Sequence, residues 1–300
     1  MNVAVAPIQI TRPDPAAPIL IVTPANLAIR AGTVIDGLGP QHIFEHDTPV
    51  ETISRVPGQD YGIRVAADDG RPIALPVSAS IVGDGVTFAG FHFAPGGNAT
   101  ARAGGDTMPA INPLSCWDQG FRPACPDPRG MTLVTMPDGK RIWVDIYKLG
   151  VEHLVDGTSH HGATIADGWK NLPQKPTGKG KVKALDFATA TAIYAHHGKQ
   201  LLSYDEFRAA AFGVTERTSA SSKPTTAGLD APRTSACGVM QATGNLYDWG
   251  TDGDPDDPRP SIFGGYWSSG VNAGSRYADL VSWAGDSGVS ISARGRSDHL

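Results

Sequence analysis

The chain has 300 residues, of which 18% are charged and 40% are hydrophobic, and its formal net charge is −5 at pH 7. This acidic balance gives no cationic surface for a polyanion, so no nucleic-acid partner is expected, and no apolar run reaches the ~18 residues of a membrane-spanning helix. The 36 glycines, 24 prolines and six tryptophans predict an ordered, loop-rich chain of short strands with few helices.

The N-terminal segment, residues 1–24, carries five prolines and no periodic hydrophobic pattern. It predicts an extended Pro-rich arm, either disordered or packed against a partner chain. The segment also lacks the basic region and the continuous apolar core of a signal peptide. We therefore expect synthesis in a cytoplasm and no membrane insertion.

Residues 25–105 consist of short alternating runs separated by turn residues. Ile63 and Val65 alternate with polar neighbours, and Phe88, Phe91 and Phe93 close the region. Such runs at regular spacing predict a small antiparallel β-sandwich.

Two helices are expected in the second half of the chain. Asp186 is placed to cap a helix over Phe187–His197, which has apolar residues on one face. Ser203 and Glu206 have the spacing of a capping box, which predicts a second helix over Tyr204–Phe212.

The last ninety residues contain only loops and short strands, yet they include three tryptophans. Irregular backbone that buries aromatic side chains needs its amides and carbonyls satisfied locally, which explains the many Gly, Asn, Asp and Ser residues. We therefore expect rigid loops over buried Trp249, Trp267 and Trp283.

The sequence offers little for metal or redox chemistry. Cys116, Cys125 and Cys237 are odd in number and too widely spaced for a zinc motif, so buried free thiols are expected, with a Cys116–Cys125 disulfide as the alternative. Five aspartates crowd a turn-rich segment without the EF-hand pattern, which favours a solvated acidic loop over a calcium site. No metal site and no cofactor are therefore predicted. The aspartates are Asp248, Asp252, Asp254, Asp256 and Asp257.

Three short motifs follow one another in the second half: Gly198–Phe207, Gly244–Trp249 and Phe263–Trp267. In this order they resemble the motifs of formylglycine-generating-enzyme-like proteins, a branch of the C-type lectin fold. Further segments, spread from Ala25 to Leu300, resemble the phage major tropism determinants, which are tail-fibre receptor-binding proteins with a lectin fold. These segments include Ala89–Gly96, Pro126–Thr132, His153–Leu154, Ile165–Gly168 and Asp298–Leu300.

This resemblance implies a fold class and a function. It implies an α+β chain with a small N-terminal β-sandwich at 25–105, followed by a C-type lectin-fold domain at 106–300. It also implies a homotrimer in the virion, at the tail fibre or baseplate tip, which contacts other phage tail proteins and binds a bacterial cell-surface protein or glycan. The family has a larger N-terminal β-prism, and here only the arm at 1–24 is expected in its place, for virion attachment or trimer contact.

The resemblance also implies a set of receptor-binding residues, because residues 262–300 are similar to the family's variable segment, a target of a diversity-generating retroelement. Alternate residues from 266 to 272 are expected on one side of an extended stretch, with Trp267 directed to the other. Tyr, Ser, Asn and Gly suit an adaptable binding surface, whereas intervening residues such as Arg276 and Arg294 are expected to be scaffold. The receptor-binding set is Tyr266, Ser268, Gly270, Asn272, Asp279, Val281, Ser282, Asp286, Gly288, Ser290 and Ile291.

An enzyme is the main alternative within this fold, and the residues argue against it. Formylglycine-generating enzymes use a cysteine pair after the Gly-Gly-x-Trp segment, whereas Ser268 and Ser269 stand there and no cysteine follows Cys237. The histidine pairs, His160–His161 and His196–His197, lack the His-x-x-x-His-x-Glu spacing of the iron-dependent relatives. No catalytic residue is predicted. The alternative function is a structural tail-fibre or baseplate component that binds another virion protein.

Overall fold

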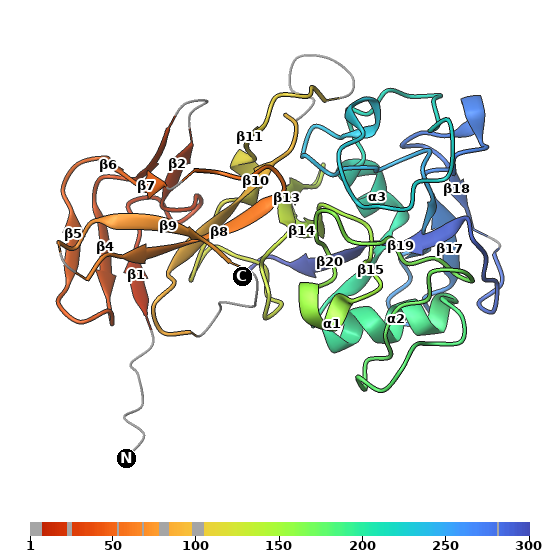
Figure 1. Cartoon of the computed structure of the whole chain (residues 1–300), viewed down its shortest axis with the longest axis horizontal. Coiled ribbons are helices and arrows are strands. Elements are labelled where there is room, and N and C mark those ends of the chain that lie inside the picture. Colours follow the sequence, from red (N-terminus) through yellow and green to blue (C-terminus); the bar gives the residue numbers. More distant parts are fainter. Residues whose placement is uncertain are drawn as a thin grey trace.

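The computed structural model describes residues 8–22, 26–52, 54–67, 69–77, 84–97, 105–280 and 282–300. This part of the chain is mostly β-structure with few helices, as the composition predicts. Figure 1 shows an elongated molecule with the N-terminal strands at one end, the helices and several late strands at the other, and the C-terminus near the middle.

Two small antiparallel sheets form the N-terminal end, with the strand orders β1–β4–β5 and β2–β3–β6 (Figure 1). Their strands are β1 (Gln9–Thr11), β2 (Leu20–Val22), β3 (Leu27–Ile29), β4 (Thr33–Asp36), β5 (His42–Phe44) and β6 (Thr48–Pro49).

The prediction of an extended N-terminal arm is wrong for the part of residues 1–24 that the structure describes, because this part forms two strands of the small sheets. Strands β1 and β2 pair with β4 and β3, and Ile19 is fully buried. The buried carboxylate of Asp118 holds this segment, since one oxygen lies 2.8 Å from Arg12 Nη1 and the other accepts a 3.0 Å hydrogen bond from Ile19 N–H. Pro13, Pro15 and Pro18 lie between β1 and β2, where no ladder hydrogen bond needs the N–H that proline lacks. Residues 1–7, 23 and 24 lie outside the described ranges.

A six-stranded sheet follows, with the order β11–β10–β8–β9–β7 and with β12 paired to β10. Pairing of β11 and β12 with β10 carries this sheet past residue 105. One hydrophobic cluster, which includes Ile29, Ile35, Tyr61 and Phe91, connects the sheet to the two small ones. Its strands are β7 (Glu51–Thr52), β8 (Gln59–Val65), β9 (Pro72–Pro76), β10 (Ala89–Ala94), β11 (Ala110–Ile111) and β12 (Trp117–Asp118).

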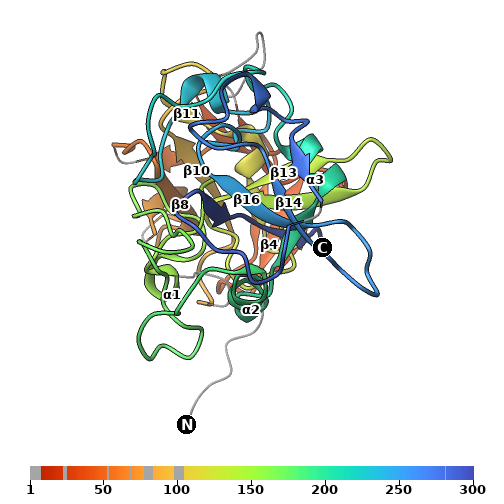
Figure 2. The same cartoon turned by 90° about the vertical axis from the view of Figure 1, so that its right-hand side faces the viewer.

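The second half is built on an eight-stranded mixed sheet of order β13–β14–β20–β15–β16–β17–β18, with β19 paired to β16. The last strand, β20, lies between β14 and β15, so the end of the chain is held inside the sheet. Figure 2 looks onto this end of the molecule, where β16 lies near the centre with loops around it. The strands are β13 (Met131–Thr135), β14 (Arg141–Asp145), β15 (Gln200–Ser203), β16 (Tyr247–Thr251), β17 (Pro260–Phe263), β18 (Ala278–Asp279), β19 (Ile291–Ala293) and β20 (Gly295–Asp298).

Both predicted helices form, and their caps are confirmed. Helix α2 (Phe187–His196) begins at Asp186, whose carboxylate accepts a 2.8 Å hydrogen bond from the N–H of Thr189. Helix α3 (Tyr204–Ala210) begins with the predicted capping box and ends before Phe212. The short helix α1 (His153–Asp156) and the 3-10 turns η1 (Pro113–Ser115), η2 (Ala231–Arg233) and η3 (Gly270–Asn272) also occur. Within the described ranges, no helix is long and apolar enough to span a membrane.

The three cysteines are free, so the prediction of free thiols is confirmed and the alternative Cys116–Cys125 disulfide is wrong. Cys116 and Cys125 are buried as expected, whereas Cys237 is only half-buried. Partial burial still raises the pKa of Cys237 to about 11, which keeps this thiol protonated at neutral pH.

Acid should destabilise the fold through a histidine pair. His153 Nδ1 lies 2.9 Å from His197 Nε2, and burial, followed by the charge of Lys199, lowers the pKa of His197 to about 3. An unfolded histidine titrates near ~6.5, so below that pH the unfolded chain binds a proton that the folded chain does not, and stability falls as the pH drops. We expect the melting temperature to decrease between about pH 6.5 and about pH 5, and less steeply in His197→Gln. An identical pH slope in the variant would contradict this assignment.

Candidate functional site

The predicted receptor-binding residues that the structure describes lie within residues 264–291, and we call the loops formed by residues 264–290 the loop face. Val281 lies outside the described residues. Ile291 does not reach the surface, because it is only 8% exposed and packs in the core with Trp249. The exposed positions are Ser268, Gly270, Asn272 and Asp286, and the half-buried ones are Tyr266, Asp279, Ser282, Gly288 and Ser290.

The extended stretch predicted over 266–272 is wrong. Tyr266 makes one bridge to Asn245, after which the chain turns and coils into η3. The turn is closed by a 3.0 Å hydrogen bond from Tyr266 N–H to Ser269 Oγ. Alternation with a period of two holds only in a strand, so it could not place these side chains. Ser268, Gly270 and Asn272 are exposed because they lie on the outside of this turn.

Tyr266 belongs to a cluster of three half-buried tyrosines that the sequence did not reveal. The ring of Tyr247 is centred 5.0 Å from that of Tyr266 and 5.5 Å from that of Tyr277. Burial raises the pKa of Tyr247 to about 12, so its phenol is neutral at physiological pH. Strand β16 supplies Tyr247 and the loop face supplies the other two, so the fold alone brings them together. Rigid rings with hydroxyl groups are well suited to recognition.

The three late tryptophans have three different environments. Trp249 is fully buried, as predicted, and its indole N–H donates to the carbonyl of Leu185 at 2.9 Å. Trp267 is half-buried. Trp283 is 80% exposed, so its predicted burial is wrong. Residues 283–287 are all exposed, so the indole lies on the exposed part of its loop.

The 282–290 loop is nevertheless ordered by one hydrogen bond within it and one to a neighbouring segment. Trp283 N–H donates to Asp286 Oδ2 at 3.1 Å, and Gly168 N–H donates to the carbonyl of Gly288 at 3.0 Å. Trp169, which follows Gly168 directly, is 74% exposed. The loop face therefore carries an exposed indole of its own and borders a second one.

Beneath the loop face lies a buried ionic network. Lys148 Nζ donates to Asp248 Oδ1 at 2.6 Å, and Arg294 Nε lies 3.5 Å from Asp248 Oδ2. Arg294 also donates to the carbonyls of Ile146 and Met240, and it is 1% exposed, so its predicted scaffold role agrees with the structure. Asp248 is therefore a core residue, and its grouping with the acidic loop is wrong.

The remaining aspartates of the acidic segment form a turn. The carboxylate of Asp254 accepts hydrogen bonds from the N–H groups of Asp256 and Asp257, and these three side chains are exposed. Among the residues that the structure describes, no group of three or more His, Cys, Asp or Glu side chains is arranged to hold a metal ion.

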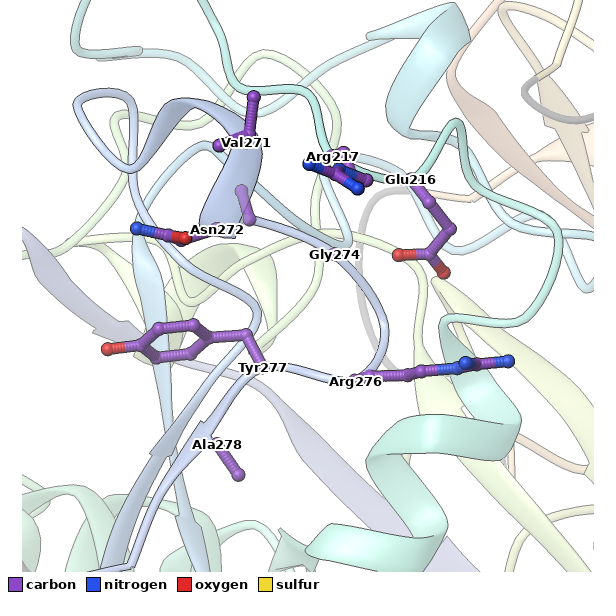
Figure 3. A pocket seen from close by; sticks show the side chains of 9 residues that line it. Glu216, Arg217, Val271, Asn272, Gly274, Arg276, Tyr277 and Ala278 are labelled. Carbon is purple, nitrogen blue, oxygen red and sulfur yellow. The ribbon is translucent and has the colours of Figure 1, made fainter.

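A pocket of about 570 Å³ opens beside Asn272, between residues 216–217 and residues 271–278 (Figure 3). Tyr277 of the tyrosine cluster lines it as well. The pocket was not predicted, because Glu216 and Arg217 come from a loop distant in sequence that carries no motif.

Comparison with known proteins identifies relatives of this chain. No family model matches the chain. The tail fiber receptor-binding protein of Bordetella phage BPP-1 is 40% identical over 312 residues, which cover 92% of this chain and 80% of that protein. The solved structure of the Major Tropism Determinant U1 variant has a TM-score of 0.87 at 38% identity, over 97% of this chain and 86% of its own. The I1 variant has a TM-score of 0.88 at 37% identity, over 98% and 86%.

Proposed function

Because the chain belongs to the major tropism determinant family of phage tail-fibre receptor-binding proteins, we propose that it attaches a phage tail to a bacterial cell through the loop face. The observation that supports this proposal is a difference in exposure between the loop face and the residues beneath it. Nine predicted positions are exposed or half-buried on the loop face, whereas Asp248 and Arg294 below it are buried and paired. Side chains on such loops can change without disturbing the core.

We further propose two structural units and a trimer. Although two smaller clusters contain residues of both halves, the main N-terminal cluster uses buried residues from Ile19 to Cys116, whereas two clusters of the second half use buried residues from Val134 onwards. This separation supports a β-sandwich unit followed by a C-type lectin-fold unit, with the boundary after β12 rather than at residue 105. By family membership, the assembly is a homotrimer at the tail fibre or baseplate tip, joined to other tail proteins. Its function is recognition without catalysis, of a bacterial surface protein or glycan.

Purified protein is expected to block adsorption of its phage to host cells, because soluble loop faces occupy the receptors first. Adsorption is measured as free phage that remain after mixing with cells incubated with increasing protein. The matched control is the protein with residues 262–300 replaced by those of a relative that infects another host. If saturating protein leaves adsorption unchanged, the receptor-binding proposal fails. Phage that carry the same replacement should form intact particles with a changed host range; if they fail to assemble instead, the segment binds another virion protein.

A further inference from the structure

The pocket beside Asn272 is built by two segments that hold each other. Glu216 accepts hydrogen bonds from the backbone N–H of Ser275, at 3.1 Å, and from its hydroxyl. This approach depends on Gly274, since a Cβ there would lie 2.0 Å from Glu216 Oε2. The carboxylate of Glu216 is therefore occupied by hydrogen bonds to Ser275 and holds the two walls of the pocket together.

Arg217 has an unusual backbone conformation at the same place. Its φ is 61°, in the left-handed region that non-glycine residues rarely adopt. A 2.9 Å hydrogen bond from Arg217 N–H to the carbonyl of Ala273 holds this conformation. Strained backbone of this kind is often found where a side chain must be aimed at a ligand, and in Figure 3 the guanidinium of Arg217 lies at the rim of the pocket.

The pocket is lined by two arginines and one carboxylate, that of Glu216, so its charged lining is positive on balance. Arg217 and Arg276 are both exposed, and neither guanidinium has an ion-pair partner within the described ranges. Across from Glu216 and Arg276, Figure 3 shows the amide of Asn272 and the ring of Tyr277. Packing against Tyr247, at 5.5 Å between ring centres, fixes the position of Tyr277. Guanidinium groups bind carboxylate and phosphate well, and a fixed aromatic ring offers an apolar contact.

We propose that this pocket binds an anionic sugar residue of the receptor, a hexose unit that carries a carboxylate or a phosphate. The volume of about 570 Å³ lies within the range of small-molecule sites, ~300–1,000 Å³, and a single acidic side chain of a protein receptor would leave most of it empty. The guanidinium of Arg217 binds the anion, Arg276 adds positive charge at the rim, and Asn272 and Tyr277 contact the ring. This assignment rests on the proposed function, since it names the receptor's chemistry.

The test uses the full chain with glucuronic acid, glucose 6-phosphate and glucose, observed by saturation-transfer NMR and titration calorimetry. Either anionic sugar, or both, should bind weakly and compete with each other, while glucose should not bind. Arg217→Gln should weaken binding by at least about tenfold, as expected for a lost hydrogen bond to a charged group, and Arg276→Gln should weaken it less. Arg259→Gln, an exposed arginine outside the pocket, is the matched control. Circular dichroism checks that each variant is folded.

Two results would overturn the pocket assignment. One is the absence of binding by both anionic sugars. The other is cell binding that depends on Arg217 but survives periodate oxidation of the cell-surface glycans, which would mean that a protein supplies the anion. If the parent protein blocks phage adsorption but no sugar binds, the pocket proposal fails and the receptor-binding function stands. If the sugars bind but the parent protein does not block phage adsorption, the pocket proposal stands and the proposed receptor-binding function fails.

Discussion

Trp283→Ala is expected to weaken binding of the protein to host cells by about 30- to 1,000-fold, the range of interface hot spots. An indole that is 80% exposed contributes little to folding, while its large rigid surface can be buried by a receptor. It stands between the candidate residues Ser282 and Asp286, and the hydrogen bond from its N–H to Asp286 orders the loop before binding. The measurement is the apparent dissociation constant of fluorescently labelled protein on host cells.

Met108→Ala is the matched control for this variant. Met108 is 70% exposed and lies next to β11, away from the loop face, so its replacement should leave cell binding unchanged. Both variants should keep the melting temperature of the parent, because both side chains are exposed. A Trp283 variant that binds cells normally but changes the oligomeric mass would place the indole in a subunit contact and contradict the prediction.

The features that the sequence predicted correctly are local ones. The caps of α2 and α3 depend on residues within one turn of each other, so Asp186 and the pair Ser203–Glu206 indicated them directly. The exposure of Ser268 and Asn272 was expected from the family resemblance, although the backbone that exposes them is a turn and a 3-10 helix. Turn geometry depends on hydrogen bonds such as that of Ser269, which no periodicity reveals.

The features that it missed depend on residues far apart in the chain. Tyr247 and Tyr277 meet because β16 and β17 pair and the loop face folds back over them. Arg217 reaches the pocket because its N–H finds Ala273, more than fifty residues away. The backbone of Ile19 is held by Asp118, about one hundred residues later in the chain, and its side chain packs in the N-terminal cluster. Such contacts depend on how the strands are connected and paired, so the residues close to them in the sequence do not predict them.

Asp248 shows how strongly such long-range contacts hold the base of the loop face. It is fully buried with Lys148 and Arg294, which come from segments about one hundred residues before it and nearly fifty after it. Burial lowers the pKa of Lys148 to about 8, because desolvation outweighs the favourable charge of Asp248. Removal of Asp248 would leave two buried cations without their shared counterion.

Asp248→Asn is therefore expected to lower the free energy of unfolding by about 3–5 kcal/mol, the usual effect of breaking a buried ion pair by removing one partner. The difference in stability between variant and parent should narrow as the pH rises toward about 8, because Lys148 loses its proton in the folded variant at a lower pH than in the folded parent, while both unfolded chains still hold it. Urea denaturation at several pH values measures both effects. Asp257→Asn, in the exposed acidic turn, should change stability by less than about 0.5 kcal/mol. Equal stability of the two variants would mean that the buried network is not what keeps the loop face in place.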